Sequence, residues 1–384
     1  GIISDPEVEG TGIKAALTTL SQALADFSQS PYQETNANIV MNAFKGVTQV
    51  LNEYDANLKT LMEQTKNDLS VAVEDINTKL DQLSELNSSI AHEIFSNNDY
   101  DGVNYGPNDL LDQRNVILDD LSRYGDVQVT DLEDGKIQVK INGKVVVDAS
   151  GASYTNDKLN IGSDGVTLTW NSNNQNANLG AGAIRGFTDM LTGADPINAG
   201  IPYYQNKMDN FAQTLADVFN NKIHADDPDF PDKYKFLLQG GVDGKVTAGN
   251  ISISDQWADD VSYIIRKQNP DGELDNQDIL DMKAAFEQDF NFGGEYTGTF
   301  SEFITSVTNT LGSGIKTNSA RMSASLAIAE SADSERMGVS GVSLNEEGIS
   351  MMTYNKAYQA LGRLMTTMDE QLDMIINKMG IVGR

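Results

Sequence analysis

The chain has 384 residues, with 27 lysines and arginines against 56 aspartates and glutamates, which gives a formal net charge of −29. This charge argues against nucleic acid and anionic membranes as partners, since binding to either needs cationic side chains. No cysteine and only two histidines are present, which excludes disulfides, thiol catalysis and metal sites built from cysteines or several histidines. The length is sufficient for two or three domains, each with its own hydrophobic core.

The first part of the chain is predicted to be helical. Apolar residues three and four apart define one face of a helix over 12–30, and a second helical pattern covers 34–45. A longer apolar stripe then runs from Val50 to Ile94, and Thr65 is its single interruption. Because no proline or glycine lies within this stripe, one long helix is the simplest interpretation.

Another helix is expected after the glycine- and asparagine-rich loop at 96–106. Asn108 is its expected N-cap, and Asp109 would lie in the first turn, where the helix dipole favours an acidic side chain. Gly125 marks its end.

At residue 126 the hydrophobic period changes from helical to alternating. Alternating apolar residues and the hairpin dipeptide Asn142-Gly143 predict a small antiparallel β region over 126–179. A helical return is expected over 180–225. The chain is therefore predicted to combine long helices with a small sheet.

The next stretch, 226–298, is interpreted as a variable mixed or β-rich insertion, because it contains acidic turns, several prolines and short apolar pieces. Strand-like patterns occur at 245–247 and 251–253. A helical pattern returns over 299–340.

The segment 341–384 carries the sharpest pattern. Ser343 and Glu346 have the spacing of a capping box, which marks the start of a helix. Apolar side chains then alternate three and four apart, and a heptad stripe of this length needs a partner helix. A helix covered by the core of this chain is the alternative interpretation. We call these residues the heptad seam, and they are Met351, Tyr354, Tyr358, Leu361, Met365, Met368, Leu372, Ile375 and Met379.

Residues for catalysis or for cofactor binding do not converge in the sequence. His92 and His224 each lie near the end of a predicted helix, where a cation is favourable, and are better explained by that position than by catalysis. The acidic stretches 226–232 and 271–275 offer oxygen ligands for calcium but lack the spacing of an EF-hand loop. We therefore expect no enzymatic activity, no cofactor and no metal, with calcium in these loops as an open alternative.

Three blocks of the sequence together point to one family. The second block covers 180–186 and the helix end at 218–224, and the third covers 341–347 and 354–360. The first block consists of Pro107, Asn108, Asp109, Leu110, Leu111, Asp112, Gln113 and Arg114. Together they resemble the hook-associated protein 1 family of the bacterial flagellum.

The blocks differ in how specific they are. The third resembles a pattern shared by axial flagellar proteins in general, and Gly348 departs from it. The first block favours hook-associated protein 1 over the other axial proteins, although Asn115 departs from the family pattern directly after it.

The resemblance implies a mainly α protein with a β-rich outer part (α+β), an elongated multidomain axial protein with a long-helix bundle and small antiparallel β domains. A helical middle domain would comprise 1–125 and 299–340, and 341–384 would be the C-terminal helix of a terminal coiled coil. An N-terminal heptad helix would precede Gly1 in the natural protein. Without that partner, the segment 341–384 is expected to be mobile, self-associating or packed differently.

The function implied by the resemblance is that of a structural subunit between hook and filament. It would be exported without a cleavable signal peptide and would lie outside the cell. The implied partners are hook protein, hook-associated protein 3, copies of itself in a ring, and an export chaperone on the C-terminal helix. The alternatives are another axial protein, namely hook-associated protein 3 or hook protein, and a secreted calcium-dependent adhesin or hydrolase.

Overall fold

The computed structural model describes residues 12–97, 107–149, 155–177, 179–223, 236–241, 244–265, 276–341 and 343–373. It divides into a first unit, Gly1–Gly312, and a second unit, Ser313–Arg384. The helices that form the first unit or begin in it are α1 (Gly12–Gln29), α2 (Glu34–Asn97), α3 (Asn108–Ser122), α4 (Gly182–Thr192), α5 (Ile201–Asn220), α6 (Asp255–Asp259), α7 (Gln277–Ala284) and α8 (Phe300–Ser340).

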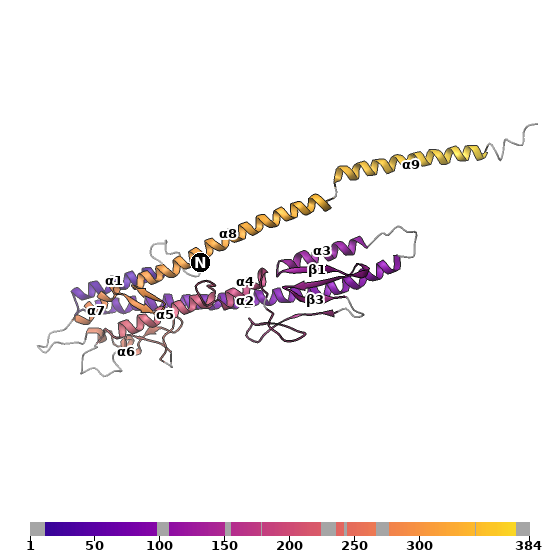
Figure 1. The fold of residues 1–384 in the computed structure, drawn as a ribbon. Helices are drawn as coiled ribbons and strands as arrows, with labels where there is room; N and C mark the ends of the chain where they lie inside the picture. The colour runs from indigo at the N-terminus through magenta and orange to yellow at the C-terminus, as the bar shows by residue number, and fades with distance from the viewer. Residues whose placement is uncertain are drawn as a thin grey trace, which may run out of the picture. The chain divides into compact units, whose positions relative to one another are not determined.

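The long helix α2 organises the first unit (Figure 1). α1 folds back along its first half, where α5 also packs, and α3 and α4 pack further along it. The chain reverses between α1 and α2 at Pro31, whose missing N–H and fixed backbone torsion do not allow α1 to continue. The helices expected over 12–30 and 180–225 are confirmed, the latter as the pair α4 and α5.

The helical pattern over 34–45 and the apolar stripe over 50–94 belong to one helix, because α2 runs through Gly46 without interruption. A glycine inside a helix costs about 1 kcal/mol, and Val47 and Leu51 on the next turn are fully buried, which outweighs that cost. Thr65, which interrupts the apolar stripe, is also buried. Its hydroxyl donates to the Leu61 carbonyl over 2.8 Å, so the polar group is satisfied within the helix.

Two hydrophobic cores lie along α2. The first contains side chains from α1, the first part of α2, α5 and the start of α8, together with residues between 237 and 292. It includes an aromatic cluster in which Phe292 stacks on Phe303 with centroids 4.3 Å apart and Phe211 stacks on Phe303 at 5.9 Å. The second core joins the later part of α2, from Leu69 to Leu83, to α3, α4 and the β-sheet.

The antiparallel β region is confirmed. The strands in the described part of the chain are β1 (Val127–Asp131), β2 (Ile137–Ile141), β3 (Lys144–Asp148), β4 (Thr155–Asn156), β5 (Leu159–Ile161), β6 (Leu168–Trp170), β7 (Leu238–Gln239), β8 (Ser252–Ile253), β9 (Phe290–Phe292) and β10 (Tyr296–Gly298). The first four form a sheet in the order β1-β2-β3-β4, and β5 and β6 form a separate hairpin. Asn142 and Gly143 form the tight turn between β2 and β3, with φ of 49° and 80°, as expected for a dipeptide that tolerates positive φ.

Asparagine side chains of α2 fasten the β structure to the helix. The Asn87 amide donates to the Ile137 carbonyl over 2.9 Å and accepts from the Ile137 N–H over 3.1 Å. Asn77 makes the same pair of bonds with Leu159 of β5, both at 2.9 Å. Since Asn87 is fully buried, these bonds satisfy backbone groups that water cannot reach. We call Asn77 and Asn87 the amide clips.

The stretch expected as a strand at 245–247 is a loop, whereas the one at 251–253 contains β8. Side chains of α5 bind the loop backbone in place of a strand partner. Gln213 accepts from the Val246 N–H over 3.2 Å, and Asp209 accepts from the Ala248 N–H over 2.8 Å. The described residues of the predicted insertion at 226–298 contribute to the first core rather than forming one of their own.

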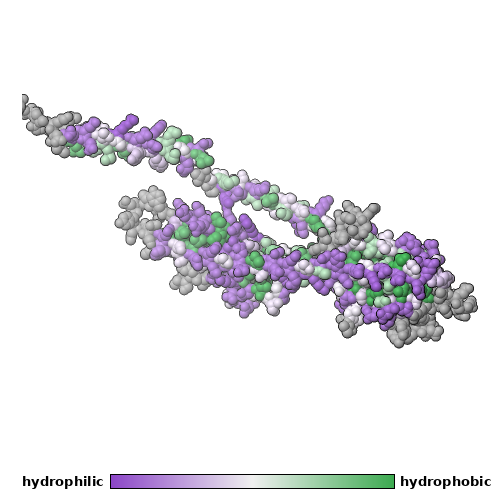
Figure 2. Space-filling view, turned by 180° about the vertical axis from the view of Figure 1, so that it is seen from behind, coloured by the Kyte–Doolittle hydropathy of each residue, from purple (hydrophilic) through white to green (hydrophobic). Residues whose placement is uncertain are grey.

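The second unit consists, in its described part, of the later portion of α8 and of α9 (Leu344–Asp373). All of its described side chains with an assigned accessibility are exposed. Figure 2 shows apolar side chains reaching the surface along these helices, among polar ones. The mainly α fold with small antiparallel sheets is as expected.

Candidate assembly interface

The heptad seam lies on α9 and is fully described from Met351 to Leu372. These seven side chains are between 49% and 79% exposed. Ile375 and Met379 lie outside the described residues. Ser343 caps the helix, since its hydroxyl accepts from the Glu346 N–H over 3.4 Å, as the capping-box spacing predicts. The apolar stripe predicted from the sequence therefore lies on a helix, and no described part of the chain buries it.

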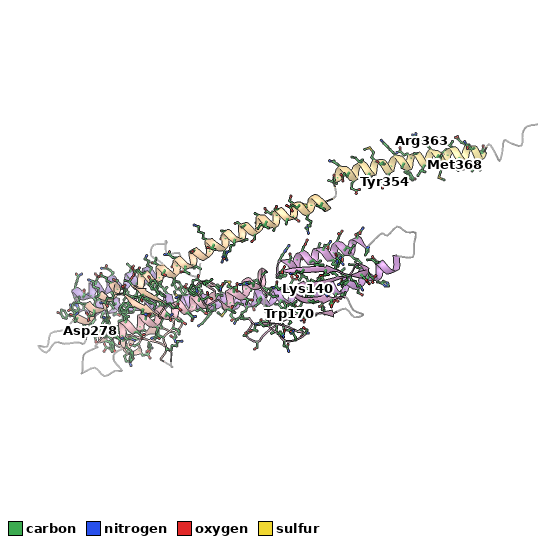
Figure 3. All side chains as sticks on the ribbon, viewed as in Figure 1. Lys140, Trp170, Asp278, Tyr354, Arg363 and Met368 are labelled. Atoms are coloured by element: carbon green, nitrogen blue, oxygen red, sulfur yellow. The ribbon has the colours of Figure 1, made fainter. Side chains whose placement is uncertain are left out.

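α9 has two unlike faces. Tyr354 and Met368 of the seam lie on one side of the helix and Arg363 lies on the other (Figure 3), as the 3.6-residue period requires. Lys356 is seven residues before Arg363 and shares its side. Glu370 follows Arg363 by another seven residues, so this side is polar and carries charges of both signs. An apolar stripe opposite a polar side is typical of a surface that binds another helix.

The first family block forms the start of α3. Asn108 is not the N-cap as predicted, because the cap is Pro107, with no side-chain cap bond, and Asn108 is the first helical residue. The Pro107 carbonyl accepts from the N–H groups of Leu110 and Leu111, both at 3.0 Å. Asp109 lies in the first turn, as expected.

Arg114 ends this block and joins α3 to the sheet. Its guanidinium donates to the Gly135 carbonyl over 2.6 Å, in the turn between β1 and β2. Burial lowers the pKa of Arg114, and the nearby Asp131 carboxylate opposes that shift. Arg114 therefore holds the sheet against α3.

The second family block contacts the end of α3, and no sequence pattern predicts this contact. Gly182 begins α4 with φ of 78°, and a Cβ there would lie 2.3 Å from the Tyr124 carbonyl carbon. The next residue, Ala183, donates its N–H to the Arg123 carbonyl over 2.9 Å. Only glycine allows the two backbones to approach so closely.

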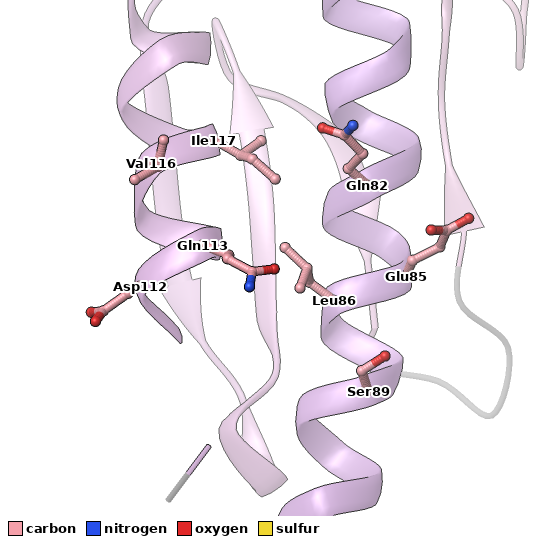
Figure 4. A pocket seen from close by; sticks show the side chains of 8 residues that line it. All are labelled: Gln82, Glu85, Leu86, Ser89, Asp112, Gln113, Val116 and Ile117. Atoms are coloured by element: carbon pink, nitrogen blue, oxygen red, sulfur yellow. The ribbon is translucent and has the colours of Figure 1, made fainter. Parts of the chain in front are cut away.

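An open groove of about 630 Å³ lies between α2 and α3 (Figure 4). Leu86 and Ile117 project into the space between the helices, whereas Asp112 and Glu85 lie toward the outer edges. We call it the α2–α3 groove, and its lining residues are Gln82, Glu85, Leu86, Ser89, Asp112, Gln113, Val116 and Ile117. No sequence pattern predicts this groove, because it depends on how two separate helices pack.

Candidate residues for other chemistry are not brought together. Among the described residues no group of three or more histidine, aspartate or glutamate side chains has the geometry to hold a metal. His92 lies near the end of α2, and His224 and the candidate calcium stretches 226–232 and 271–275 lie outside the described residues. No helix in the described part of the chain is long and apolar enough to span a membrane.

Comparisons with known proteins point to one family. The family model "Flagellar hook-associated protein FlgK helical domain" matches residues 6–232, and that of the C-terminal part of flagellar basal body rod FlgEFG proteins matches 334–378. Flagellar hook-associated protein 1 of Bacillus subtilis (strain 168) is 25% identical over 414 residues, covering 98% of this chain and 78% of that protein.

A solved structure is also similar, the flagellar hook junction protein FlgK from Burkholderia pseudomallei, at 20% identity and a TM-score of 0.43. The alignment covers 56% of this chain and 38% of that one, so this chain spans well under two thirds of its length. The match over 6–232 takes in α1 to α5, the four-stranded sheet and two of the sequence blocks described above. The chain belongs to the FlgK family of flagellar hook-associated proteins.

Proposed function

We propose that this protein is a non-enzymatic structural subunit at the junction between the flagellar hook and filament, outside the cell. Membership of the FlgK family supports the role, and the relatives are named as hook-associated or hook junction proteins. Its work would be the packing of helices between subunits. In this role 1–125 and 299–340 form the helical middle domain, with the parts between them facing outward and 341–384 joining the terminal coiled coil.

The observation that carries the proposal is the exposure of the heptad seam. Burial of apolar surface contributes about 25 cal/mol per Å², so seven large apolar side chains in water leave a large favourable free energy unrealised. A seven-residue period is met by a left-handed pairing of helices, in which each side chain enters a gap on the partner. We infer that assembly buries the seam against a second helix supplied from outside the described residues.

Membership of the FlgK family, rather than the seam itself, suggests the partners. In the assembled flagellum these would be hook protein, hook-associated protein 3 and copies of this protein in a ring. Before export, an apolar stripe of this length is prone to association in the cell. A chaperone that covers α9 until export, which proceeds without a cleavable signal peptide, would prevent this.

The test is complementation in bacteria lacking their own junction protein, using the full-length protein. The seam variant Leu361→Glu/Met365→Glu places two charges in the stripe, and the control Met352→Glu/Gln359→Glu places two charges on another side of the same helix. We expect the unaltered protein and the control to support filaments on hook ends. The seam variant is expected to be exported into the medium without supporting filament growth.

Filaments of normal length with the seam variant would contradict the proposal. If the unaltered, exported protein failed to restore filaments, the junction role itself would be wrong, and hook-associated protein 3 or hook protein would be the role to test next. The match over 6–232 favours the junction role over both. Calcium-dependent melting that maps to 226–298 would instead support the adhesin or hydrolase alternative.

A further inference from the structure

The α2–α3 groove has the character of a site for a helix. On α2, its lining residues Gln82, Glu85, Leu86 and Ser89 follow the i, i+3, i+4, i+7 spacing of one helical face. Val116, on the opposite wall, is 61% exposed. Of the eight described lining residues two are acidic and none is basic. In the groove the apolar side chains of Leu86 and Ile117 lie beside the Gln113 amide, and the acidic side chains lie at its outer edges.

A stretch of α8 has the complementary character. No aspartate or glutamate occurs between Glu302 and Glu330, in a chain with 56 acidic residues. Two cations, Lys316 and Arg321, lie in this stretch. The rest of 313–329 is dominated by serine, alanine and glycine, whose small side chains let another helix approach closely.

This stretch also has an apolar stripe with the cations beside it. Ile315, Met322 and Leu326 are seven and four residues apart, which places them on one helical face, and they are 58%, 73% and 56% exposed. By the same period, Lys316 and Arg321 lie about 100° and 120° to either side of Ile315. An amphipathic helix flanked by cations fits a groove with apolar side chains inside and carboxylates at its edges.

We propose that residues 313–329 of α8 pack into the α2–α3 groove of a second copy of this chain. Ile315, Met322 and Leu326 then cover the apolar side chains of the groove, and Lys316 and Arg321 face Glu85 and Asp112. The contact joins two different surfaces, so repeating it produces a ring or a helical array rather than a closed dimer. It makes no use of the heptad seam and does not depend on the junction role.

Cysteine pairing tests this contact directly, because the chain has no cysteine of its own. One preparation carries Val116→Cys in the groove, and a second, longer by a tag, carries Met322→Cys on α8. The control replaces the groove cysteine with Val71→Cys, which is similarly exposed on α2. Under mild oxidation we expect the Val116→Cys mixture to form the linked heterodimer several-fold faster than the control mixture.

Charge reversal adds a second arm. Glu85→Lys/Asp112→Lys in the groove copy, or Lys316→Glu/Arg321→Glu in the α8 copy, should each reduce the heterodimer rate to that of the control. Combining both changes in one mixture should restore the rate of heterodimer formation, since the charges are then exchanged across the contact. All four residues are exposed, so the fold should tolerate the changes, which circular dichroism checks.

Three results would overturn the proposal. The first is equal cross-linking of Val116→Cys and Val71→Cys with the α8 cysteine, and the second is a rate unaffected by charge reversal. The third is a chain carrying both cysteines that links to itself at high dilution and leaves no intermolecular product when concentrated. The complementation result for the seam variant stands apart from all three, because that variant alters neither surface.

Discussion

α2 and α9 carry similar sequence patterns with opposite outcomes. Both have apolar residues three and four apart over many turns. On α2, Leu51, Leu69, Leu80 and other members of the stripe are fully buried, because α1, α3, α4, α5 and the sheet cover it. On α9, the corresponding residues are about half exposed or more.

This difference separates two properties of a periodic stripe. The period indicates that a helix has an apolar face to bury, but it does not indicate whether the same chain or another chain packs on that face. For α2 the cover comes in part from segments more than 200 residues away in the same chain, such as Trp257, whose ring centroid lies 5.3 Å from that of Phe44. For α9 the described chain supplies none, and we infer that assembly does.

The largest expected effect is in the first core. Phe211→Ala removes a ring that stacks on Phe292 and Phe303 and should lower the free energy of unfolding by about 3–5 kcal/mol. Leu361→Ala on the seam should change it by no more than about 0.5 kcal/mol, as for other exposed positions. Denaturant unfolding of both variants measures this. Similar losses in the two would mean that α9 is already packed in the free protein.

The next effect is at the contact between α3 and α4. Gly182→Ala should cost about 2 kcal/mol or more, because φ is positive and the new Cβ meets the Tyr124 backbone. Gly186→Ala in the same helix is the control, since no described atom lies within 4 Å of its Cβ position, and it should stabilise the helix by up to about 1 kcal/mol. Thermal unfolding that failed to separate these two variants would contradict the close approach.

A smaller effect is expected at the amide clips. Asn87→Ala leaves the buried N–H and carbonyl of Ile137 without partners, which should cost about 1–3 kcal/mol. Asn115→Ala on the exposed side of α3 is the control and should be near neutral. Hydrogen exchange at Ile137 should accelerate in the first variant alone. Unchanged exchange there would show that the sheet holds to α2 without the clip.

The smallest effect depends on pH. Burial raises the pKa of Asp209, and the nearby Asp55 carboxylate raises it further. The hydrogen bond from the Ala248 N–H and the charges of two lysines lower the pKa and offset part of this shift. Because the folded state holds this proton more tightly than the unfolded chain, ionisation of Asp209 lowers stability as the pH rises through the raised pKa. Asp209→Asn should therefore gain stability, by less than about 1 kcal/mol, at neutral pH, and lose this advantage near pH 3.

Unfolding measured at both pH values, with the exposed Asp68→Asn as control, checks the sign. A variant that is less stable than the unaltered protein at pH 7, with the deficit vanishing in acid, would show that the ionised carboxylate stabilises the loop instead.

Several features were predictable from the sequence because they are local. The periods of α1, α2 and α9, the turn at Asn142-Gly143 and the family block from Pro107 to Arg114 each depend on neighbouring residues. The continuity of α2 through Gly46 was not predictable in this way, because it depends on the burial of Val47 and Leu51 by other segments.

The other features that the sequence did not predict also depend on contacts between segments. Residues 245–247 have the spacing of a strand, but Asp209 and Gln213 supply the hydrogen bonds that a strand would take. In the sequence the amide clips are ordinary polar positions of a helix, and only the fold brings Ile137 and Leu159 beside them. The α2–α3 groove likewise exists only once two helices are packed. The roles of the seam and of the 226–298 stretch stay predictions.

Hydrogen exchange of α9 before and after assembly tests directly whether assembly covers the heptad seam. The free protein and the protein assembled on isolated hook ends would be compared, with α2 as the internal reference. We predict that amides of 344–373 exchange rapidly in the free protein and become protected on assembly, while those of 50–90 are protected in both. Protection of α9 equal to that of α2 in the free protein would contradict the claim that assembly supplies the cover of the seam.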